Sequence, residues 1–302
     1  MARIVAVVGL VLGLVVGLQG AASAATPKIA VIVIENRPYG AIVGEPSAPY
    51  LNSLLAQGMA FTDYHAVVRG SAHDYRAMVA GEIRVTSGGP NIFQSLGSTS
   101  WISLQESMKG NCGRRSSAVV PGTSELLYVH GHDPASMYRS ADACTTNDVP
   151  LTSDAQLLSL PAFAFISPNT CDDMHTYPTT GICPAYFGPV SGPTPIRIGD
   201  AWLAHVVPIL LGAGETVFVT FDETGKNDTQ RVYAVEVGPG VGAGTADATT
   251  YDHYGLLAGL YTVFGLGTAP HSAASATPVP FPAASSPSLR ASRPPSRPRR
   301  SP

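Results

Sequence analysis

Carboxylate and amide side chains follow two strongly apolar runs of this 302-residue sequence, at the point where each run ends. Glu35 and Asn36 come directly after the run IAVIVI, and Asp222 and Glu223 come directly after TVFVTF. Burying a carboxylate is costly unless a cation or several hydrogen-bond donors meet it. Each pair therefore either marks the place where a strand reaches the surface or lies beside a positive partner.

A third apolar run, FAFIS, is followed by Asn169, Asp172, Asp173 and His175. If the three runs are parallel strands, their ends lie along one edge of a sheet, where carboxylates repel one another unless a cation lies between them. Oxygen ligands suit Mg, Ca or Mn, and a histidine would extend the choice to Zn. Acids after strands also begin turns and cap helices, which is the better interpretation of any one pair alone.

Ser71 follows a glycine and precedes the helix-like stretch AHDYRAMVA. A hydroxyl in this position is typical of a helix N-cap, which is the simplest interpretation of a lone serine. The same position suits a nucleophile, because the first N–H groups of a helix and its dipole attract a phosphate. A nearby metal ion would activate the hydroxyl, which is a weak nucleophile on its own.

The other histidines and two tyrosines give weaker signals. His130 and His132 form a His-x-His pair that could bind a metal from one side of a strand, although a loop without a ligand is the simpler prediction. Structural, solvated or core positions, some of them near the serine, are predicted for His65, His73, His205, Tyr75 and Tyr251.

Apolar runs alternate with helix-like stretches along the chain, which predicts an α/β fold with a mostly parallel central sheet and helices on both faces. In such folds ligands bind beyond the carboxyl ends of the strands, where the acidic pairs lie. The predicted strands are 29–34, 61–67, 117–120, 162–166, 216–221 and 231–237. The predicted helices are 48–57, 71–80, 199–211 and 254–264.

The two ends of the chain differ in composition from its middle. Residues 1–24 combine Arg3, an apolar stretch and a small-residue site ending at Ala24, which predicts a cleaved secretory signal peptide rather than a membrane anchor. We expect one catalytic domain over 25–268 and a disordered tail over 269–302 that is rich in Pro, Ser, Ala and Arg. The mature protein is then secreted and has no segment that spans a membrane.

The charge balance argues against a nucleic-acid-binding domain. Without Arg3 and the five arginines of the tail, 12 basic residues oppose 21 acidic ones, a formal charge of −9. A nucleic-acid-binding surface would be basic. The positive tail suits contact with an anionic cell envelope, although a solvated appendage without a partner is the simpler interpretation.

The chain has four cysteines, which in an exported protein predicts two disulfides. Three pairings are possible, and we favour the nearest neighbours, Cys112 with Cys144 and Cys171 with Cys183. A zinc site is the competing interpretation, but the sequence has no Cys-x-x-Cys pair.

Several short motifs occur in a distinctive order: Glu-Asn after the first strand, a serine before DYRAMVAG, then SPNTCDDMH, GDAWL, FDE, VGPGV and YDHYGLL. In this order the sequence resembles the bacterial phosphoesterases that include acid phosphatases and phospholipases C, within the alkaline-phosphatase superfamily. The resemblance covers the chain from Lys28 to about Gly267. It implies an alkaline-phosphatase-like fold and a divalent metal ion as cofactor.

The resemblance also implies roles for five residues at the predicted sheet edge. Glu35 and Asn36 match the first metal-binding pair of the family, and Asp222 and Glu223 match its later acidic pair. Ser71 matches the nucleophile, which also contacts the metal.

Three further positions match polar residues around the phosphate. His175 and His253 could place the leaving group or protonate it as a general acid, and Asp173 lies close to the former in the sequence. Cys171 lies in the family's Pro-Asn-x-Cys motif, which supports its pairing with Cys183.

The sequence departs from the family pattern at three places. Arg69 and Gly70 stand where His-Pro is expected, Arg231 stands where a histidine is common, and Asp172 replaces a neutral or basic residue. Arginine stays protonated and cannot serve as a general base, but it can bind phosphate oxygens in a bidentate manner. We therefore expect both arginines to contact the substrate, and the acid to be unfavourable if it points inward.

Taken together, these residues predict a secreted, metal-dependent phosphomonoesterase of acid-phosphatase type that acts on small phosphate esters through a phosphoserine. One alternative is a phosphodiesterase of phospholipase C type. The other is a degenerate relative that binds phosphate or an envelope polymer without turnover.

Overall fold

The computed structural model describes residues 26–84, 89–97, 100–115, 117–119, 126–138, 143–175, 194–225 and 229–283. The predicted signal peptide, the end of the predicted tail and Cys183 lie outside these residues. Across the described ranges, we find no helix with the length and apolar character needed to cross a membrane.

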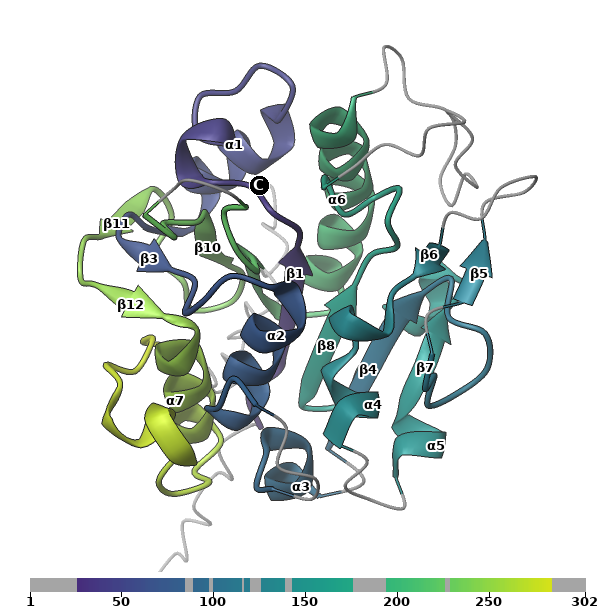
Figure 1. Cartoon of the computed structure of the whole chain (residues 1–302). Helices are drawn as coiled ribbons and strands as arrows, with labels where there is room; N and C mark the ends of the chain where they lie inside the picture. The colour runs from purple at the N-terminus through teal and green to yellow at the C-terminus, as the bar shows by residue number, and fades with distance from the viewer. Residues whose placement is uncertain are drawn as a thin grey trace, which may run out of the picture.

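An eight-stranded sheet forms the centre of the protein (Figure 1). Its order is β11 (Thr245–Asp247), β2 (Met59–Phe61), β10 (Ala234–Val237), β9 (Thr216–Phe221), β1 (Ile29–Ile34), β8 (Phe163–Ser167), β4 (Trp101–Glu106) and β7 (Asp148–Leu151). The five strands from β9 to β7 are parallel, and β10 runs antiparallel to both of its neighbours. The predicted mostly parallel sheet is confirmed.

Two small sheets lie outside the central one. The first pairs β3 (Tyr64–His65) with β12 (Tyr251–Asp252) in parallel. The second pairs β5 (Ser117–Val119) with β6 (Leu126–Tyr128) in antiparallel orientation.

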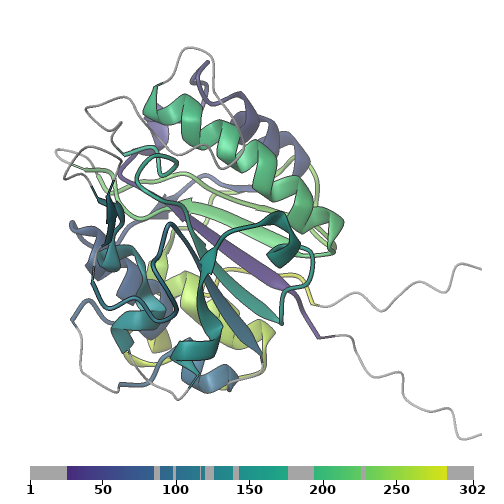
Figure 2. The same ribbon diagram turned by 90° about the vertical axis from the view of Figure 1, so that its right-hand side faces the viewer.

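Helices cover both faces of the central sheet (Figure 2). On one face α1 (Pro49–Gln57) packs against α6 (Pro195–Gly212), and on the other α2 (Ser71–Ala80) packs against α7 (His253–Val263). Because neither face meets solvent, β1 can be apolar along its whole length, and all six of its residues are buried. The shorter helical segments are α3 (Ile92–Leu96), α4 (Pro134–Tyr138), α5 (Cys144–Asn147), η1 (Tyr39–Ala41), η2 (His130–His132), η3 (Asp154–Gln156) and η4 (His271–Ser275).

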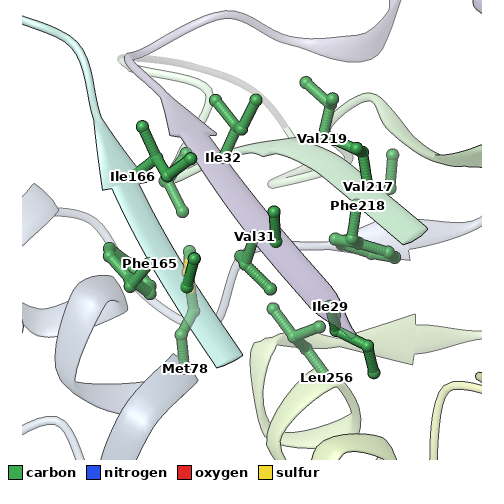
Figure 3. Packing of buried hydrophobic residues seen from close by; sticks show 14 of the residues in the cluster. Ile29, Val31, Ile32, Met78, Phe165, Ile166, Val217, Phe218, Val219 and Leu256 are labelled. Atoms are coloured by element: carbon green, nitrogen blue, oxygen red, sulfur yellow. The ribbon is translucent and has the colours of Figure 1, made fainter. Parts of the chain in front are cut away.

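One continuous cluster of buried side chains joins the sheet to the helices (Figure 3). Met78 of α2 and Leu256 of α7 belong to it together with Ile29, Val31 and Phe165 of the central strands. Burying a side chain of this size contributes about 1.5–3 kcal/mol. The cluster therefore fixes the strands, and with them the positions of the polar residues at the strand ends.

The predicted boundary of the domain at residue 268 is too early. Within the predicted tail, η4 forms one turn, Val279 is 1% exposed, and its N–H donates to the Gly255 carbonyl over 2.9 Å. The Phe281 ring lies 5.8 Å from that of Phe218, between centroids. Scattered apolar residues thus attach 269–283 to α7 and β9, although the composition alone indicates disorder.

The predicted disulfide between Cys112 and Cys144 is present. It closes the part of the chain that carries β5, β6, η2 and α4. The second predicted pair stays a prediction, because Cys183 lies outside the described residues.

Candidate active site

Three neighbouring strands bring acidic side chains from distant parts of the chain to one place. β1 lies between β9 and β8 and runs parallel to both, with Ile34 opposite Phe221. Glu35, Asp222 and Asp173 follow the three strands and are at most 1% exposed. The prediction that these strand ends share one edge of the sheet is confirmed.

Glu35 receives several hydrogen bonds at this edge. The Ser71 hydroxyl donates to its Oε2 over 2.9 Å, and the Asn36 amide donates to the same oxygen over 3.0 Å. The Tyr75 hydroxyl donates to Oε1 over 2.6 Å. His132 Nε2 lies 3.5 Å from Oε2. The carboxylate thus connects β1 with α2 and with η2.

Ser71 is the first residue of α2, and Gly70 before it occupies the N-cap with a φ of 110°. A side chain is strained at such a φ, which explains the glycine. No side chain caps this helix end, so the hydroxyl does not form the predicted N-cap bond. The Gly70 N–H donates to Glu223 Oε1 over 2.9 Å instead. The Ser71 hydroxyl therefore donates to the Glu35 carboxylate at the end of β1 and does not cap the helix.

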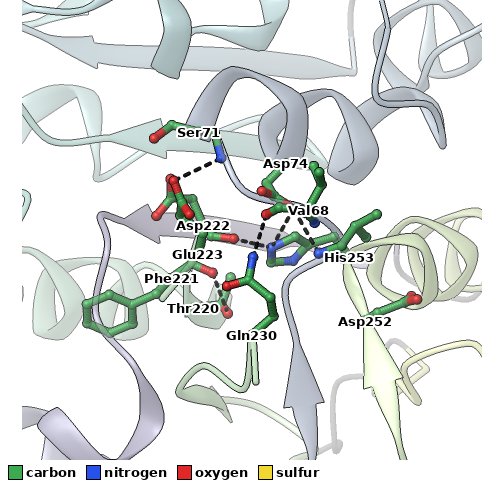
Figure 4. A network of polar contacts seen from close by, with 12 residues as sticks. Val68, Ser71, Asp74, Thr220, Phe221, Asp222, Glu223, Gln230, Asp252 and His253 are labelled. Carbon is green, nitrogen blue, oxygen red and sulfur yellow. Dashed lines mark hydrogen bonds and ion pairs between the residues drawn. The ribbon is translucent and has the colours of Figure 1, made fainter. Parts of the chain in front are cut away.

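Asp222 is fixed through its backbone, which Figure 4 shows bonded to His253, and through one carboxylate oxygen. Its N–H donates to the Ile34 carbonyl over 2.9 Å, and its Oδ1 accepts the Asn36 N–H over 2.8 Å. His253 Nε2 lies 2.6 Å from its backbone carbonyl oxygen. Its Oδ2 is buried and has no hydrogen-bond partner.

A tight turn after β8 places Asp173 and His175. The Asp173 carbonyl accepts the Glu35 N–H, and its Oδ1 accepts the His175 N–H over 2.8 Å. The Arg37 guanidinium donates to the Met174 carbonyl over 2.7 and 2.9 Å and to the His175 carbonyl over 3.0 Å. The arginine after the Glu-Asn pair thus holds this turn against the end of β1.

Burial destabilises the charged form of the acids at this edge. Burial, followed by the charges of Asp222 and Asp173, raises the pKa of Glu35 well above its usual range. Burial also raises the pKa of Asp173 to about 8, while the His175 N–H opposes that shift. A positive group placed between these carboxylates would reverse the penalty.

The donor atoms at the strand ends fit a divalent cation. Three carboxylates, a serine hydroxyl and an asparagine supply oxygen ligands, and the unpartnered Asp222 Oδ2 is an oxygen that a cation would satisfy. Among the described residues, three His, Cys, Asp or Glu ligand atoms come within 4.8 Å of one another at Cys112, Cys144 and Asp148 alone. Those sulfurs form the disulfide and supply no thiolate, so the mixed oxygen set is the better cation site.

The structure separates the predicted site histidines. His175 is exposed and close enough to Asp222 for the two charges to interact, which puts it at the rim of the site. His253 is fully buried, bonded to the Asp222 carbonyl and to the Tyr64 hydroxyl at 3.1 Å. Burial lowers the pKa of His253 to about 4. This placement does not suit the predicted general acid, because the ring has no access to a leaving group.

His132 lies beside the site, and whether it binds a ligand stays a prediction. Its ring stacks on Tyr75, with centroids 5.4 Å apart and planes at 9°, and burial lowers its pKa to about 4. Tyr75 packs in the core, as predicted, and its hydroxyl also donates to Glu35. The signal that could have identified His132 is its place after β6 in a His-x-His, but nothing in the sequence pairs that segment with β1.

The two predicted substrate-binding arginines lie in different surroundings. Arg69 is exposed, and although burial raises the pKa of Glu223, the charge of Arg69 opposes that rise. Arg231 lies over the Tyr39 ring, 3.9 Å from its centroid, and donates to the Thr62 carbonyl. Arg69 is thus beside the acidic edge, whereas the contacts of Arg231 are structural.

The unusual Asp172 is paired with a second buried acid, Glu106. Asp172 is 3% exposed and hydrogen-bonds Glu106, the last residue of β4. Glu106 comes directly after Gln105, which pairs with Ser167 of β8. Burial and the neighbouring acid raise the pKa of Asp172 well above its usual range, and burial raises that of Glu106 to about 7. One of the two acids therefore keeps a proton, which limits the extra negative charge.

No family model matches the sequence. A phosphatidylinositol-3-phosphatase of Mycobacterium tuberculosis is 27% identical over 267 residues, covering 83% of this chain and 81% of that protein. Three fungal relatives named as acid phosphatases are 24–28% identical, and the chain spans 50–57% of their length. The narrower resemblance to bacterial acid phosphatases and phospholipases C stays a prediction.

Solved structures identify the fold. A protein in the alkaline phosphatase superfamily from Vibrio parahaemolyticus superposes with a TM-score of 0.51 at 13% identity, over 80% of this chain and 67% of that one. The lipoteichoic acid synthase LtaP of Listeria monocytogenes gives 0.54 at 10% identity, over 84% and 77%. The chain has an alkaline-phosphatase-like fold.

Proposed function

We propose that this protein is a phosphoric-ester hydrolase that cleaves phosphate monoesters with Ser71 as nucleophile. The observation that carries the proposal is the 2.9 Å hydrogen bond from the Ser71 hydroxyl to Glu35, at the edge where Asp222 and Asp173 also lie. A serine at a helix N-terminus beside a carboxylate has both a proton acceptor and backbone donors for an anion.

The relatives support this class of reaction. All four matched relatives are named as phosphatases, and the Mycobacterium protein is named for a phosphoinositide monoester. The two share only about a quarter of their residues, so the substrate proposed here is the wider class, a phosphate monoester of an organic alcohol.

Glu35, Asn36, Asp222, Glu223 and Ser71 are the residues proposed to hold a divalent cation. Such an ion, when bound, would lower the pKa of the serine hydroxyl and draw charge from the phosphoryl oxygens. Oxygen ligands suit Mg, Ca or Mn, and Zn would need a histidine as a further ligand.

The serine and its carboxylate perform the first chemical step. Glu35 accepts the hydroxyl proton as the Ser71 oxygen forms a bond to phosphorus and the bond from phosphorus to the alcohol oxygen breaks. The alcohol leaves with a proton from His175 or from solvent at the rim. Water then attacks phosphorus, the bond to the serine oxygen breaks, Glu35 returns its proton to that oxygen, and inorganic phosphate is released.

Neighbouring groups orient these reactants. Tyr75 and Asn36 donate to Glu35 and fix its carboxylate plane. Arg69 is exposed beside Glu223 and can contact phosphate oxygens from the open side. We also propose export through removal of residues 1–24, as the sequence predicts.

The test uses the full chain purified from the culture medium, with its N-terminus sequenced to check cleavage after Ala24. Hydrolysis of a chromogenic phosphate monoester is measured for the intact protein, after chelation and metal return, and for Ser71→Ala. Ser53→Ala serves as the control, because that hydroxyl bonds only within α1, donating to the Tyr50 carbonyl and accepting from the Gln57 amide. Hydrolysis that is lost with the chelator and in Ser71→Ala alone is the expected result.

Three other results contradict the proposal in different ways. Full activity of Ser71→Ala excludes this nucleophile. Hydrolysis of a phosphodiester alone moves the protein to the phospholipase C type. A folded, metal-loaded protein without turnover on either ester favours the degenerate binder.

A further inference from the structure

Behind the candidate site lie three polar side chains that the proposed reaction does not use. His253, Tyr64 and Asp74 are each 0% exposed, although they come from α7, β3 and α2. Burying three such groups is costly unless their hydrogen bonds are satisfied. Their contacts therefore indicate what the arrangement does.

His253 is directed at the backbone of Asp222. The carbonyl oxygen of Asp222 can only accept, so His253 Nε2, at 2.6 Å, must carry the proton and donate it. His253 Nδ1 then accepts from the Tyr64 hydroxyl at 3.1 Å. Two partners thus determine both the tautomer and the orientation of the ring.

Asp74 is directed at the segment that leads to the nucleophile. Its Oδ1 accepts the Val67 N–H over 2.8 Å and the Val68 N–H over 3.2 Å, three or four residues before Ser71. The same Oδ1 lies 3.7 Å from His253 Nε2 (Figure 4). Its other oxygen is buried without a partner.

The imidazole thus touches two elements that must keep their relative position. One is the end of β9, where Asp222 offers its carboxylate. The other is the segment 67–70, which the ring reaches through Asp74; this segment leads into Ser71, and its Gly70 N–H donates to Glu223. β3 and β12 pair directly behind this segment, so Tyr64 and His253 stay adjacent through the backbone as well.

We propose that His253 is a positioning residue that keeps Asp222 and the Ser71 segment in register for phosphoryl transfer. It contacts neither substrate nor phosphorus and acts through the Asp222 carbonyl on one side and Asp74 on the other. The inference rests on the proposed function, because register between these two elements matters for a reaction that uses both.

The decisive comparison is His253→Phe against His253→Gln. Phenylalanine fills the space but has no donor, so kcat should fall about 10–100-fold while KM changes less than about 3-fold, as for residues that orient ligands from behind. Glutamine places an amide donor near the position of Nε2, and kcat should return to within about 5-fold of wild type.

A matched control separates positioning from simple loss of stability. Leu256→Ala removes a fully buried side chain one turn along the same helix, and should lower Tm while kcat of the folded protein stays within about 2-fold. Tyr64→Phe should lower kcat less than His253→Phe, because it removes one of the two bonds that orient the ring.

A second readout does not need turnover. MnCl2 or MgCl2 alone should raise the Tm of the wild-type protein, and this rise should be smaller in His253→Phe and kept in Leu256→Ala. If His253→Phe lowers Tm but keeps kcat and the metal-induced rise, the inference is wrong. If wild type hydrolyses no ester while the rise still depends on His253, the proposed function fails and the positioning role stands.

Discussion

Two groups of buried acids can be compared within this one domain. The strand-end group is Glu35, Asp173 and Asp222, and the disulfide-side group is Asp133 and Asp148, all of them at most 1% exposed. Each group contains a carboxylate oxygen with no hydrogen-bond partner, and in each burial raises at least one pKa. By burial and acidity alone the two groups are equivalent.

Their neighbours differ. The disulfide-side group faces Tyr128, which donates to Asp133 over 2.6 Å, and the Cys144 sulfur 3.9 Å from Asp148. The strand-end group has the Ser71 hydroxyl bonded to it and lies at the carboxyl ends of parallel strands. A serine hydroxyl bonded to an acid at the sheet edge where ligands bind, rather than acid burial, therefore distinguishes the candidate site.

The largest expected effect is a loss of hydrolysis when an acid of the strand-end group, but not of the disulfide-side group, is changed. Asp222→Asn keeps an oxygen for the Asn36 N–H but removes one negative charge from the proposed cation site. We expect hydrolysis to fall about 10²–10³-fold, since a fixed charge at the reacting group is lost. Asp148→Asn is the matched control and should stay within about 2-fold of wild type. Equal losses in steady-state assays of the two would remove the distinction.

A smaller effect concerns the segment that links the groups. His132 belongs to the loop closed by the disulfide, yet its Nε2 lies 3.5 Å from Glu35. His132→Phe keeps the stacking on Tyr75 and loses the ring N–H, so we expect kcat to fall about 10-fold. His130→Phe changes the other histidine of the same turn and should have little effect. A comparable loss in both variants would assign the effect to the turn itself.

The local pattern was enough to predict the elements that carry the site. The runs 29–34, 216–221 and 71–80 agree residue for residue with β1, β9 and α2, because each is strongly apolar or ends at a glycine. β4 and β7 were missed, since WISLQE and DVPL mix polar residues into short strands. Their identity as strands depends on the pairing of β4 with β8 and of β7 with β4, which the sequence does not display.

The site was predictable where it depends on strand ends and not where it depends on long-range packing. Parallel strands necessarily align Glu35 with Asp222, whatever the loops do. His132 reaches Glu35 only because a loop folds over the edge of the sheet, and Arg231 turns to Tyr39 rather than to the acids. The arrival of His253 behind Asp222 likewise depends on where α7 begins.

The disulfide-side group should have little effect on activity but a clear effect on the free energy of unfolding. Burial and then Asp133 raise the pKa of Asp148 to about 9, against 3.8 in the unfolded chain. Below about pH 4 both states hold the proton, and as pH rises towards 9 only the unfolded chain releases it, so stability falls. Asp148→Asn removes this penalty and should raise the free energy of unfolding at pH 8 by ~2–4 kcal/mol, with little change at pH 4.

Urea unfolding of both proteins at the two pH values tests this prediction. A gain of equal size at pH 4 and pH 8 would mean that packing, rather than the carboxyl proton, is responsible. A loss at pH 8 would mean that the ionised carboxylate is stabilising, and with it the comparison of the two groups would fail.

The smallest expected effect uses an isolated buried acid as the reference for both groups. Glu236 of β10 is 1% exposed, its Oε1 has no partner, and burial alone raises its pKa from 4.5 to about 8. Glu236→Gln should therefore stabilise the protein by ~1–3 kcal/mol at pH 8 and by almost nothing at pH 4.5. Because no neighbouring charge contributes, its pH dependence measures desolvation by itself. The excess seen with Asp148→Asn then measures the repulsion between paired acids, which a cation at the strand-end group would have to overcome.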